Sequence, residues 1–321
     1  MHSRWFNATV VVLWLATMGW LVTEKVLPPL LVGEPPNYQT IVDAQKKEPP
    51  AGWRLMFNDR PVGWALSSTA SQPNGLTEIR GRVHFDTLPL EEMTPGWLRT
   101  LFRLVERPVD GLKMDARSVL FIDPLGRLVR FESVVKLDPL NEVIRVRGDV
   151  EGKQLQLVVR SGDFSFTNEA YLPSNSLLGD ALSPQTQLPG LRAGQTWTVP
   201  VYSPLRPANN PLEIFRATVE GSEPVYWDDG MVDAWLVVYR SDPGGSVGGN
   251  QNARGKLWVR GDGAVLKQQI MLFDSTMTFF RLPDERAVEL EKKAGPRWWN
   301  VEIEQPKSTK SARSLKLGLH D

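Results

Sequence analysis

From residue 53 onward, apolar and polar residues alternate in short runs separated by glycine, proline, asparagine and aspartate. Successive residues of a strand point to opposite faces, so this alternation predicts half-buried β-strands joined by tight turns. The clearest strands are expected at residues 64–71, 76–87, 143–150 and 153–160, with a further hairpin over residues 118–138. The pattern predicts a mainly β fold: a curved antiparallel sheet or half-barrel with one or two short helices.

Two short segments carry residues that favour tight hairpin turns. Residues 58–61 read Asn-Asp-Arg-Pro between two apolar runs, and residues 228–230 read Asp-Asp-Gly. Asparagine, aspartate and glycine tolerate the positive φ of a two-residue hairpin turn. We interpret residues 58–61 as the first hairpin turn, with Gly63 as a site for a β-bulge. Residues 228–230 are interpreted as a turn rather than a calcium site, because alternating oxygen ligands are missing.

Helical spacing of apolar residues occurs at one place within the β-rich region. Trp97, Leu101, Leu104 and Val105 recur at intervals that put them on one face of a helix. They predict an amphipathic helix at residues 95–106, covering one face or one opening of the sheet. A short helix around residues 38–47 also fits the pattern.

The N-terminal stretch differs from the rest of the chain. Residues 5–23 contain no charged side chain, and nineteen helical residues extend roughly 28 Å, about the hydrocarbon thickness of a bilayer. Trp5 and Trp20 lie near the two ends, where indole rings suit the membrane interfaces. We therefore expect one N-terminal transmembrane helix, with the lipid bilayer as partner through residues 5–23.

A cleaved signal peptide is the competing interpretation of this stretch. The apolar run is longer than the usual core of a signal peptide, and no A-x-A cleavage site follows it. We expect an uncleaved single-pass anchor in the cell membrane, with a cytoplasmic N-terminus. The large body after the anchor is then expected in the periplasm or otherwise outside the cytoplasm.

Composition along the chain divides it into four parts. Residues 1–27 form the expected anchor, and residues 28–52 carry three Pro-Pro pairs, which favour an extended, stiff spacer. Residues 53–290 form the expected extracytoplasmic β-domain. Residues 291–321 are expected to be a basic, disordered tail, because their ending is rich in lysine and poor in aromatic residues.

Charge and composition narrow the function classes. The chain has 37 basic and 37 acidic residues, so no global field attracts it to nucleic acid. It has no cysteine, which excludes disulfides, thiolate metal sites and a cysteine nucleophile. The three histidines are His2, His84 and His320, too dispersed for a multi-histidine metal centre. We expect no metal and no cofactor.

Only one histidine falls inside the β-rich region. His84 lies two residues before Asp86, so the two share one face of a strand. No G-x-S-x-G motif is present to supply a nucleophilic serine. We assign no catalytic residue, and a hydrolase that uses His84 with Asp86 remains the alternative.

Twelve tryptophans are many for this length, and several lie in expected strands. Cross-strand packing in a core explains most such residues. The more specific interpretation is a broad apolar groove inside a curved sheet, which suits an acyl chain.

Turn and strand motifs also carry a family resemblance. The second half of the chain resembles the C-terminal half of a family of bacterial periplasmic β-domains. The matching residues lie in 191–204 and 214–239, with the run "VEGSE" at 219–223, and include Gly194, Trp258, Asp262-Gly263 and Lys267. Residues 53–64, 123–138 and 146–159 look like β-domains found upstream of bacterial transglutaminase-like domains, except that Asp59 stands where the first glycine of their opening hairpin is expected. The resemblance implies a curved antiparallel sheet akin to the half-barrel of lipoprotein carriers. It brings no catalytic residues, because no cysteine–histidine–aspartate domain follows.

Together these observations favour a membrane-anchored extracytoplasmic domain for binding or envelope assembly, without catalysis. An apolar ligand, or a partner strand added to a sheet edge, is the expected occupant. An accessory subunit of an envelope complex, contacting its partner through the anchor and Trp298-Trp299, is a further hypothesis.

Overall fold

The computed structural model describes most of the chain, in nine main segments and one single residue. They are residues 4–23, 36, 38–87, 112–138, 142–172, 177–178, 184–202, 212–241, 252–272 and 275–301. The helix expected at residues 95–106 lies outside the described residues.

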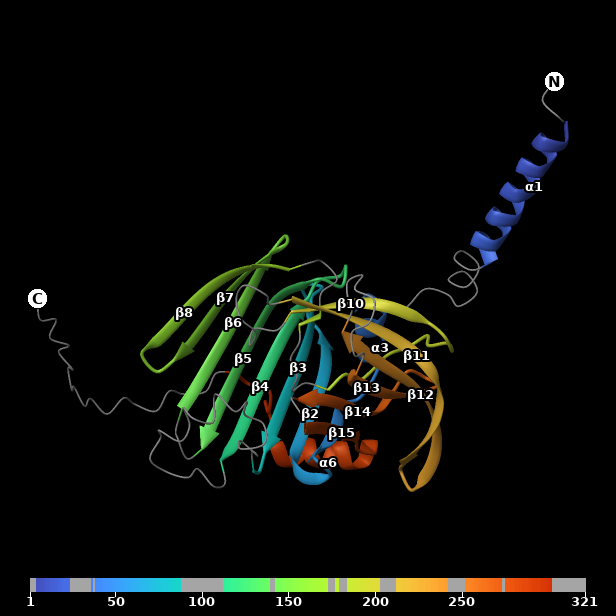
Figure 1. Ribbon diagram of the computed structural model, residues 1–321. Coiled ribbons are helices and arrows are strands. Elements are labelled where there is room, and N and C mark those ends of the chain that lie inside the picture. Colours follow the sequence, from blue (N-terminus) through green and yellow to red (C-terminus); the bar gives the residue numbers. More distant parts are fainter. Residues whose placement is uncertain are drawn as a thin grey trace, which may run out of the picture.

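One large sheet dominates the described structure (Figure 1). Its order is β8-β7-β6-β5-β4-β3-β2-β1-β15-β14-β13-β12-β11-β10-β9. The first eight strands are β1 Ala51–Phe57, β2 Arg60–Ser71, β3 Thr77–Phe85, β4 Lys113–Ile122, β5 Leu128–Asp138, β6 Glu142–Glu151, β7 Gln154–Ser161 and β8 Phe164–Tyr171. The others are β9 Leu177–Leu178, β10 Thr196–Tyr202, β11 Leu212–Trp227, β12 Gly230–Ser241, β13 Ala253–Arg260, β14 Val265–Leu272 and β15 Ser275–Arg281.

The sheet consists of two meanders joined at their first and last strands. Strands β1 to β8 follow one another in sequence on one side, and β15 back to β9 on the other. The antiparallel pairing of β1 with β15 joins them, with Leu55 opposite Phe279. All pairings are antiparallel except that of the two-residue β9 with β10. The expected antiparallel sheet is confirmed.

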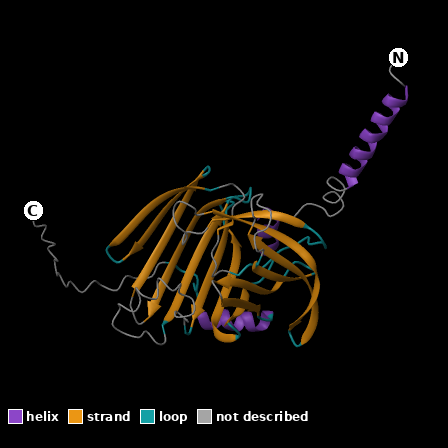
Figure 2. Ribbon diagram, in the orientation of Figure 1, coloured by secondary structure: helices purple, strands orange, loops and turns teal. Residues whose placement is uncertain are grey.

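The sheet is curved (Figure 2), and a large cluster of buried apolar side chains lies on one of its faces. Trp53, Leu55 and Phe57 lie on one face of β1, and they share a buried cluster with Val237 of the distant strand β12. Strands that are far apart in the sheet can share a cluster only when the sheet bends toward that face. We call this face the inner face and the opposite one the outer face.

Two helices pack on opposite faces of the sheet. Helix α3, Tyr38–Gln45, contributes Ile41 to the inner cluster, in agreement with the short helix expected at residues 38–47. Helix α6, Asp284–Ala294, packs on the outer face so closely that a Cβ added at Gly52 would lie 3.0 Å from Ala287. Helix α6 crosses the boundary that the composition places at residue 290, and Trp298 beyond it is buried.

The first hairpin is built as its residues indicate. Asn58 and Asp59 both have positive φ, 45° and 63°, and join β1 to β2. The register shifts between Leu55 and Met56, opposite Gly63 and Pro61, so the bulge lies where it was expected. Asp228 and Asp229 form the same kind of turn between β11 and β12, with φ of 48° and 61°.

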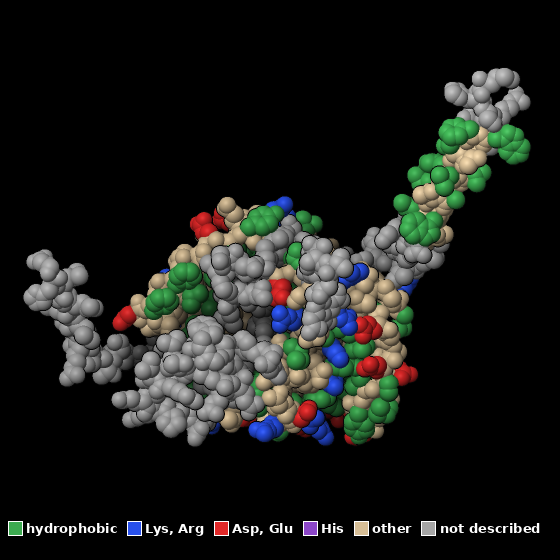
Figure 3. Space-filling view, viewed as in Figure 1, with side chains coloured by type: hydrophobic (Ala, Val, Ile, Leu, Met, Phe, Trp, Pro, Cys, Tyr) green, Lys and Arg blue, Asp and Glu red, His purple; other side chains and the backbone are tan. Residues whose placement is uncertain are grey.

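The N-terminal helix stands apart from the sheet (Figure 1). Helix α1, Arg4–Leu21, covers nearly the whole stretch that was expected to be helical. Its apolar side chains are exposed on all sides, and Figure 3 shows them over its surface. Among the described residues, no helix combines the length and hydropathy that a membrane span requires.

We expect Gly63→Ala to lower the free energy of unfolding by about 3 kcal/mol, because an added Cβ would lie 1.9 Å from the His84 carbonyl oxygen. Chemical denaturation of both proteins measures the difference. Gly221→Ala is the matched control, since nothing lies within 4 Å of a Cβ at that bulge, and its effect should stay below about 1 kcal/mol. Equal effects of the two substitutions would contradict the close approach.

Candidate functional site

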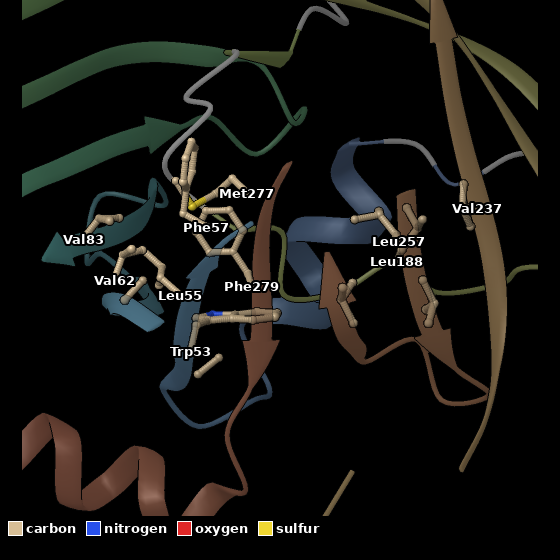
Figure 4. Close-up of a cluster of buried hydrophobic side chains, with 14 of the residues drawn as sticks. Trp53, Leu55, Phe57, Val62, Val83, Leu188, Val237, Leu257, Met277 and Phe279 are labelled. Carbon is tan, nitrogen blue, oxygen red and sulfur yellow. The ribbon is translucent and has the colours of Figure 1, made fainter. Parts of the chain in front are cut away.

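Among the described residues, the buried cluster with the most members lies on the inner face. Its buried cluster draws on both meanders, and Figure 4 shows Trp53, Phe57 and Phe279 near the central strands with Val237 on β12. Additional members come from β2, β3, β13 and β14 and from Leu188, which precedes β10. The cluster is therefore the interior that both halves of the sheet enclose.

Around this cluster the inner face carries apolar side chains that remain partly accessible. On the first meander they are Ala116, Val135 and Leu137, and on the second Leu191, Trp197, Trp235, Tyr239 and Ile270. Buried residues at the centre and partly exposed ones around them leave apolar surface that a ligand can cover.

Two polar atoms on the inner face are buried without a partner. Among the described residues, the indole Nε1 of Trp53 and the hydroxyl of Ser67 are buried and form no hydrogen bond. The two residues lie on adjacent strands, and Ala51, two positions from Trp53, pairs with Ser67. Buried polar groups nearly always have partners, so these two atoms are exceptions among the described residues.

Small side chains surround Ser67 on the inner face. Cross-strand pairing places five residues in one row across β1 to β5: Ala51, Ser67, Gly81, Ser118 and Ser133. The hydroxyl of Thr69, on the same strand as Ser67, lies 3.4 Å from the Gln45 side chain at the end of α3. The row therefore lies beside the one helix that packs on this face in the described structure.

Tyr239 adds a third polar group to the inner face. Burial raises the pKa of its hydroxyl well above the usual value, so the group stays protonated at any physiological pH. It can therefore donate a hydrogen bond to an acceptor inside the sheet.

The outer face carries a cluster of charged residues around Asp115 of β4. One carboxylate oxygen accepts hydrogen bonds from Arg82 of β3 at 2.6 and 2.9 Å, and the other accepts from Arg117 at 2.8 Å. His84 Nδ1 lies 3.3 Å from the Asp115 carboxylate, and the Trp64 ring stacks on the imidazole at 5.4 Å. These contacts tie β2, β3 and β4 together.

The same contacts set the charge of Asp115. Burial alone would raise its pKa, but hydrogen bonds from His84 and Arg82, with the charges of Arg82 and Arg117, lower the pKa well below the usual value. The carboxylate is therefore ionised in the folded protein at any ordinary pH.

His84 and Asp86 lie together as their spacing indicates, but no described residue completes a catalytic triad with them. His84 Nε2 is 3.5 Å from the Asp86 carboxylate, and Nδ1 faces Asp115. Both ring nitrogens thus face carboxylates, whereas a general base needs one nitrogen on the nucleophile's hydroxyl. Within the described chain, His84 makes no hydrogen bond to a hydroxyl group.

The outer cluster holds the last residue of α6 and the segment that follows it. Arg82 Nη1 donates to the carbonyl oxygen of Ala294 at 3.3 Å, and Arg117 Nη1 donates to that of Asn300 at 3.2 Å. The Arg80 guanidinium stacks over the Trp299 ring at 4.0 Å. These contacts could not be predicted from sequence patterns, because their donors and acceptors lie far apart along the chain.

A metal site has no support in the described part of the chain. No group of three or more histidine, aspartate or glutamate side chains lies close enough there to hold an ion. Asp229 instead accepts a long hydrogen bond of 3.5 Å from the Tyr226 hydroxyl beside its turn.

The chain was compared with known proteins. No protein-family model and no curated protein matches it. One similar structure is a β-barrel-like protein of DUF1849, a domain of unknown function, from Brucella abortus, at 12% identity and a TM-score of 0.43, covering 73% of this chain and 94% of that chain. Another is a DUF1089 family protein from Pseudomonas aeruginosa, at 15% identity and 0.31, covering 63% and 87%. Likeness at this level carries no argument about function, and the resemblance noted in the sequence stays a prediction.

We expect Asp115→Asn to lower the free energy of unfolding at pH 7 by about 2 kcal/mol, because Arg82 and Arg117 lose their partly buried counter-charge. The folded-state pKa of Asp115 is lowered, so its contribution is complete above the unfolded pKa near 3.8 and disappears as the pH falls below it. The difference between the two proteins should therefore shrink below about pH 4. Denaturant titrations at several pH values measure it.

Asp138→Asn provides the matched control, since its pair with Lys136 is much more exposed. It should change the free energy of unfolding by less than about 0.5 kcal/mol. A loss that is the same for both variants, or independent of pH, would argue against the role assigned to Asp115.

Proposed function

We propose that the protein is a membrane-anchored binding domain, located outside the cytoplasm, that holds an acyl chain on the inner face of its sheet without catalysis. The observation that carries the proposal is a pair of apolar surfaces, one exposed and one partly exposed in the described chain. One surrounds α1 and the other lines the inner face.

The first surface supports the anchor. Trp5, Val12, Leu13 and Trp20 of α1 are each more than half exposed, and these side chains point in different directions around the helix. A helix that is apolar on every side needs an apolar environment on every side. A bilayer provides one, with the two tryptophans near its interfaces.

The second surface supports the ligand. Apolar side chains at the edge of the buried cluster remain partly accessible, and the Trp53 indole and Ser67 hydroxyl lack partners in the described chain. An acyl chain would cover the partly accessible apolar side chains. Its carboxyl or ester group would offer acceptors to the Trp53 indole and the Ser67 hydroxyl. An anchor in the membrane would keep the domain next to a supply of such lipids.

The outer cluster supports a binding role over the hydrolase alternative. The Asp115 carboxylate accepts hydrogen bonds from two arginines, and the His84 ring nitrogens face two carboxylates. This geometry fits cross-linking of strands better than proton transfer to a nucleophile. We expect purified full-length protein to release no acyl group from the lipid that it binds.

Replacing Val11 and Leu15 of α1 by lysine should move the full-length protein from the membrane fraction to the soluble fraction. Each charge costs about 2.5–3.5 kcal/mol at the centre of a membrane-inserted helix. Alkaline extraction of membranes, followed by detection of the chain in pellet and supernatant, measures the change. Val11→Leu with Leu15→Val is the apolar control and should remain in the pellet. Release of the unaltered protein would refute the anchor.

Trp53→Phe should weaken binding of a fluorescent fatty acid about fivefold, because it removes the Nε1 donor and keeps an aromatic ring in the core. Trp64→Phe is the control, since Trp64 stacks on His84 at the outer face. Native mass spectrometry of the detergent-extracted protein tests the same point by detecting bound lipid. Absence of bound lipid and of fatty-acid binding in the unaltered protein would rule out the proposed ligand.

A further inference from the structure

Strand β8 forms one outer edge of the sheet. It pairs with β7 alone, and no described strand lies on its other side (Figure 1). Phe164, Phe166 and Tyr171 are 61%, 43% and 56% exposed, and Figure 3 shows apolar side chains on the surface over this strand. The edge is therefore both open and apolar.

This edge lacks the features that usually prevent strand-to-strand association. Edge strands are commonly protected by proline, lysine, bulges or short length. Strand β8 has eight residues, continuous register with β7 and a single charged residue, Glu169. Such an edge is a template for another strand.

The backbone groups available for pairing follow from the hairpin. Ser161 pairs with Phe164 across a two-residue turn, and the Leu172 amide donates to the Lys153 carbonyl oxygen at 2.8 Å. In an antiparallel ladder, alternate residues point their amide and carbonyl groups to the same neighbour. The even-numbered residues of β8 thus face β7, and Ser165, Thr167, Glu169 and Tyr171 direct theirs outward.

We propose that this edge pairs with β8 of a second copy of the chain, antiparallel, about a two-fold axis that passes between the two Thr167 residues. In this register Ser165 of each copy lies opposite Glu169 of the other. A two-fold axis perpendicular to the sheet keeps inner face on inner face, so the two sheets continue as one.

Side-chain sizes match across this axis on the inner face. Phe164 of one copy lies opposite Ala170 of the other, which packs with Leu155 in a buried cluster. Phe166 lies opposite Asn168. Each exposed ring thus meets a smaller residue, and the apolar cluster of one copy extends onto the ring of the other.

Charges match on the outer face. Ser165 pairs with Arg160 inside each copy, so Glu169 of the second copy lies in line with Arg160, separated by one small side chain. Neither Arg160 nor Glu169 forms an ion pair within the described part of its own chain. Tyr171 lies opposite Asp163 of the other copy, a donor opposite a carboxylate. The edge is complementary to itself in size and in charge, which favours a second copy over a foreign strand.

A single introduced cysteine tests the register directly, because the chain has no cysteine of its own. In the proposed pair the two Thr167 Cα atoms are about 5.5 Å apart, within the range of a disulfide. Thr167→Cys in the full-length protein, in its native membrane or in detergent, should give a dimer under mild oxidation. Ser165→Cys is the control, since its two copies lie about 14 Å apart and should not crosslink.

Charge reversal gives a second, independent test in the Thr167→Cys background. Glu169→Arg should lower the yield of the dimer about threefold by placing like charges in line. Adding Arg160→Glu should restore the yield, because the pair returns with its signs exchanged. Circular dichroism of each variant checks that the sheet is intact.

Crosslinking at Thr167→Cys alone, with recovery in the double reversal, would support the pair. A folded Thr167→Cys protein that stays monomeric, crosslinks to another protein, or crosslinks no better than Ser165→Cys would overturn it. So would a yield unaffected by charge reversal. None of these results depends on a bound lipid.

Discussion

The pairing of β1 with β15 is the interaction on which the rest of the structure depends. Either meander alone would have an open strand at the place where the other now begins. Trp53 lies opposite Arg281 and Phe57 opposite Met277, so the residues at the centre of the core come from the two ends of the folded body. The interior forms only when both meanders meet, because its cluster includes side chains from each. The partly exposed apolar residues around it follow from the same curvature.

The two faces of this sheet carry different kinds of side chains. On the inner face, apolar side chains pack on one another and leave Trp53 Nε1 and Ser67 Oγ without partners in the described chain. On the outer face, Asp115 forms ion pairs with Arg82 of β3 and Arg117 of β4, which fix the positions of both arginines. The cluster around Asp115 thus links neighbouring strands through charged contacts, whereas the described part of the inner face carries mainly apolar side chains. Fully satisfied networks of charged hydrogen bonds fix geometry, whereas buried polar atoms without a partner are rare.

Local features of this fold were predictable from the sequence, and non-local ones were not. The turn at Asn58 and Asp59 and the bulge opposite Gly63 depend on residues close together in the chain, and both were expected. Helix α6 was missed because Ala287 is its one buried residue, so its apolar pattern is faint. Strand β8 was missed because an exposed edge strand has no buried face to impose alternation. The contact of His84 with Asp115 requires the β3–β4 register, which no single segment encodes. Trp53 Nε1 and Ser67 Oγ, the buried atoms without partners on the inner face, likewise depend on contacts between segments that no single segment encodes.

The arginines that hold the end of α6 and the segment after it bind main-chain atoms. Arg82, Arg117 and Arg145 donate to the carbonyl oxygens of Ala294, Asn300 and Val301, atoms that every residue type possesses. Evolution can therefore change the side chains at those three positions without losing the contacts, while each arginine has no equivalent substitute. The alignment of the segment along the sheet depends instead on Trp298, bonded to Glu291, and on Trp299 under Arg80. In homologous chains, we expect the side chains at positions 294, 300 and 301 to vary, while the arginines and tryptophans that hold this segment are retained.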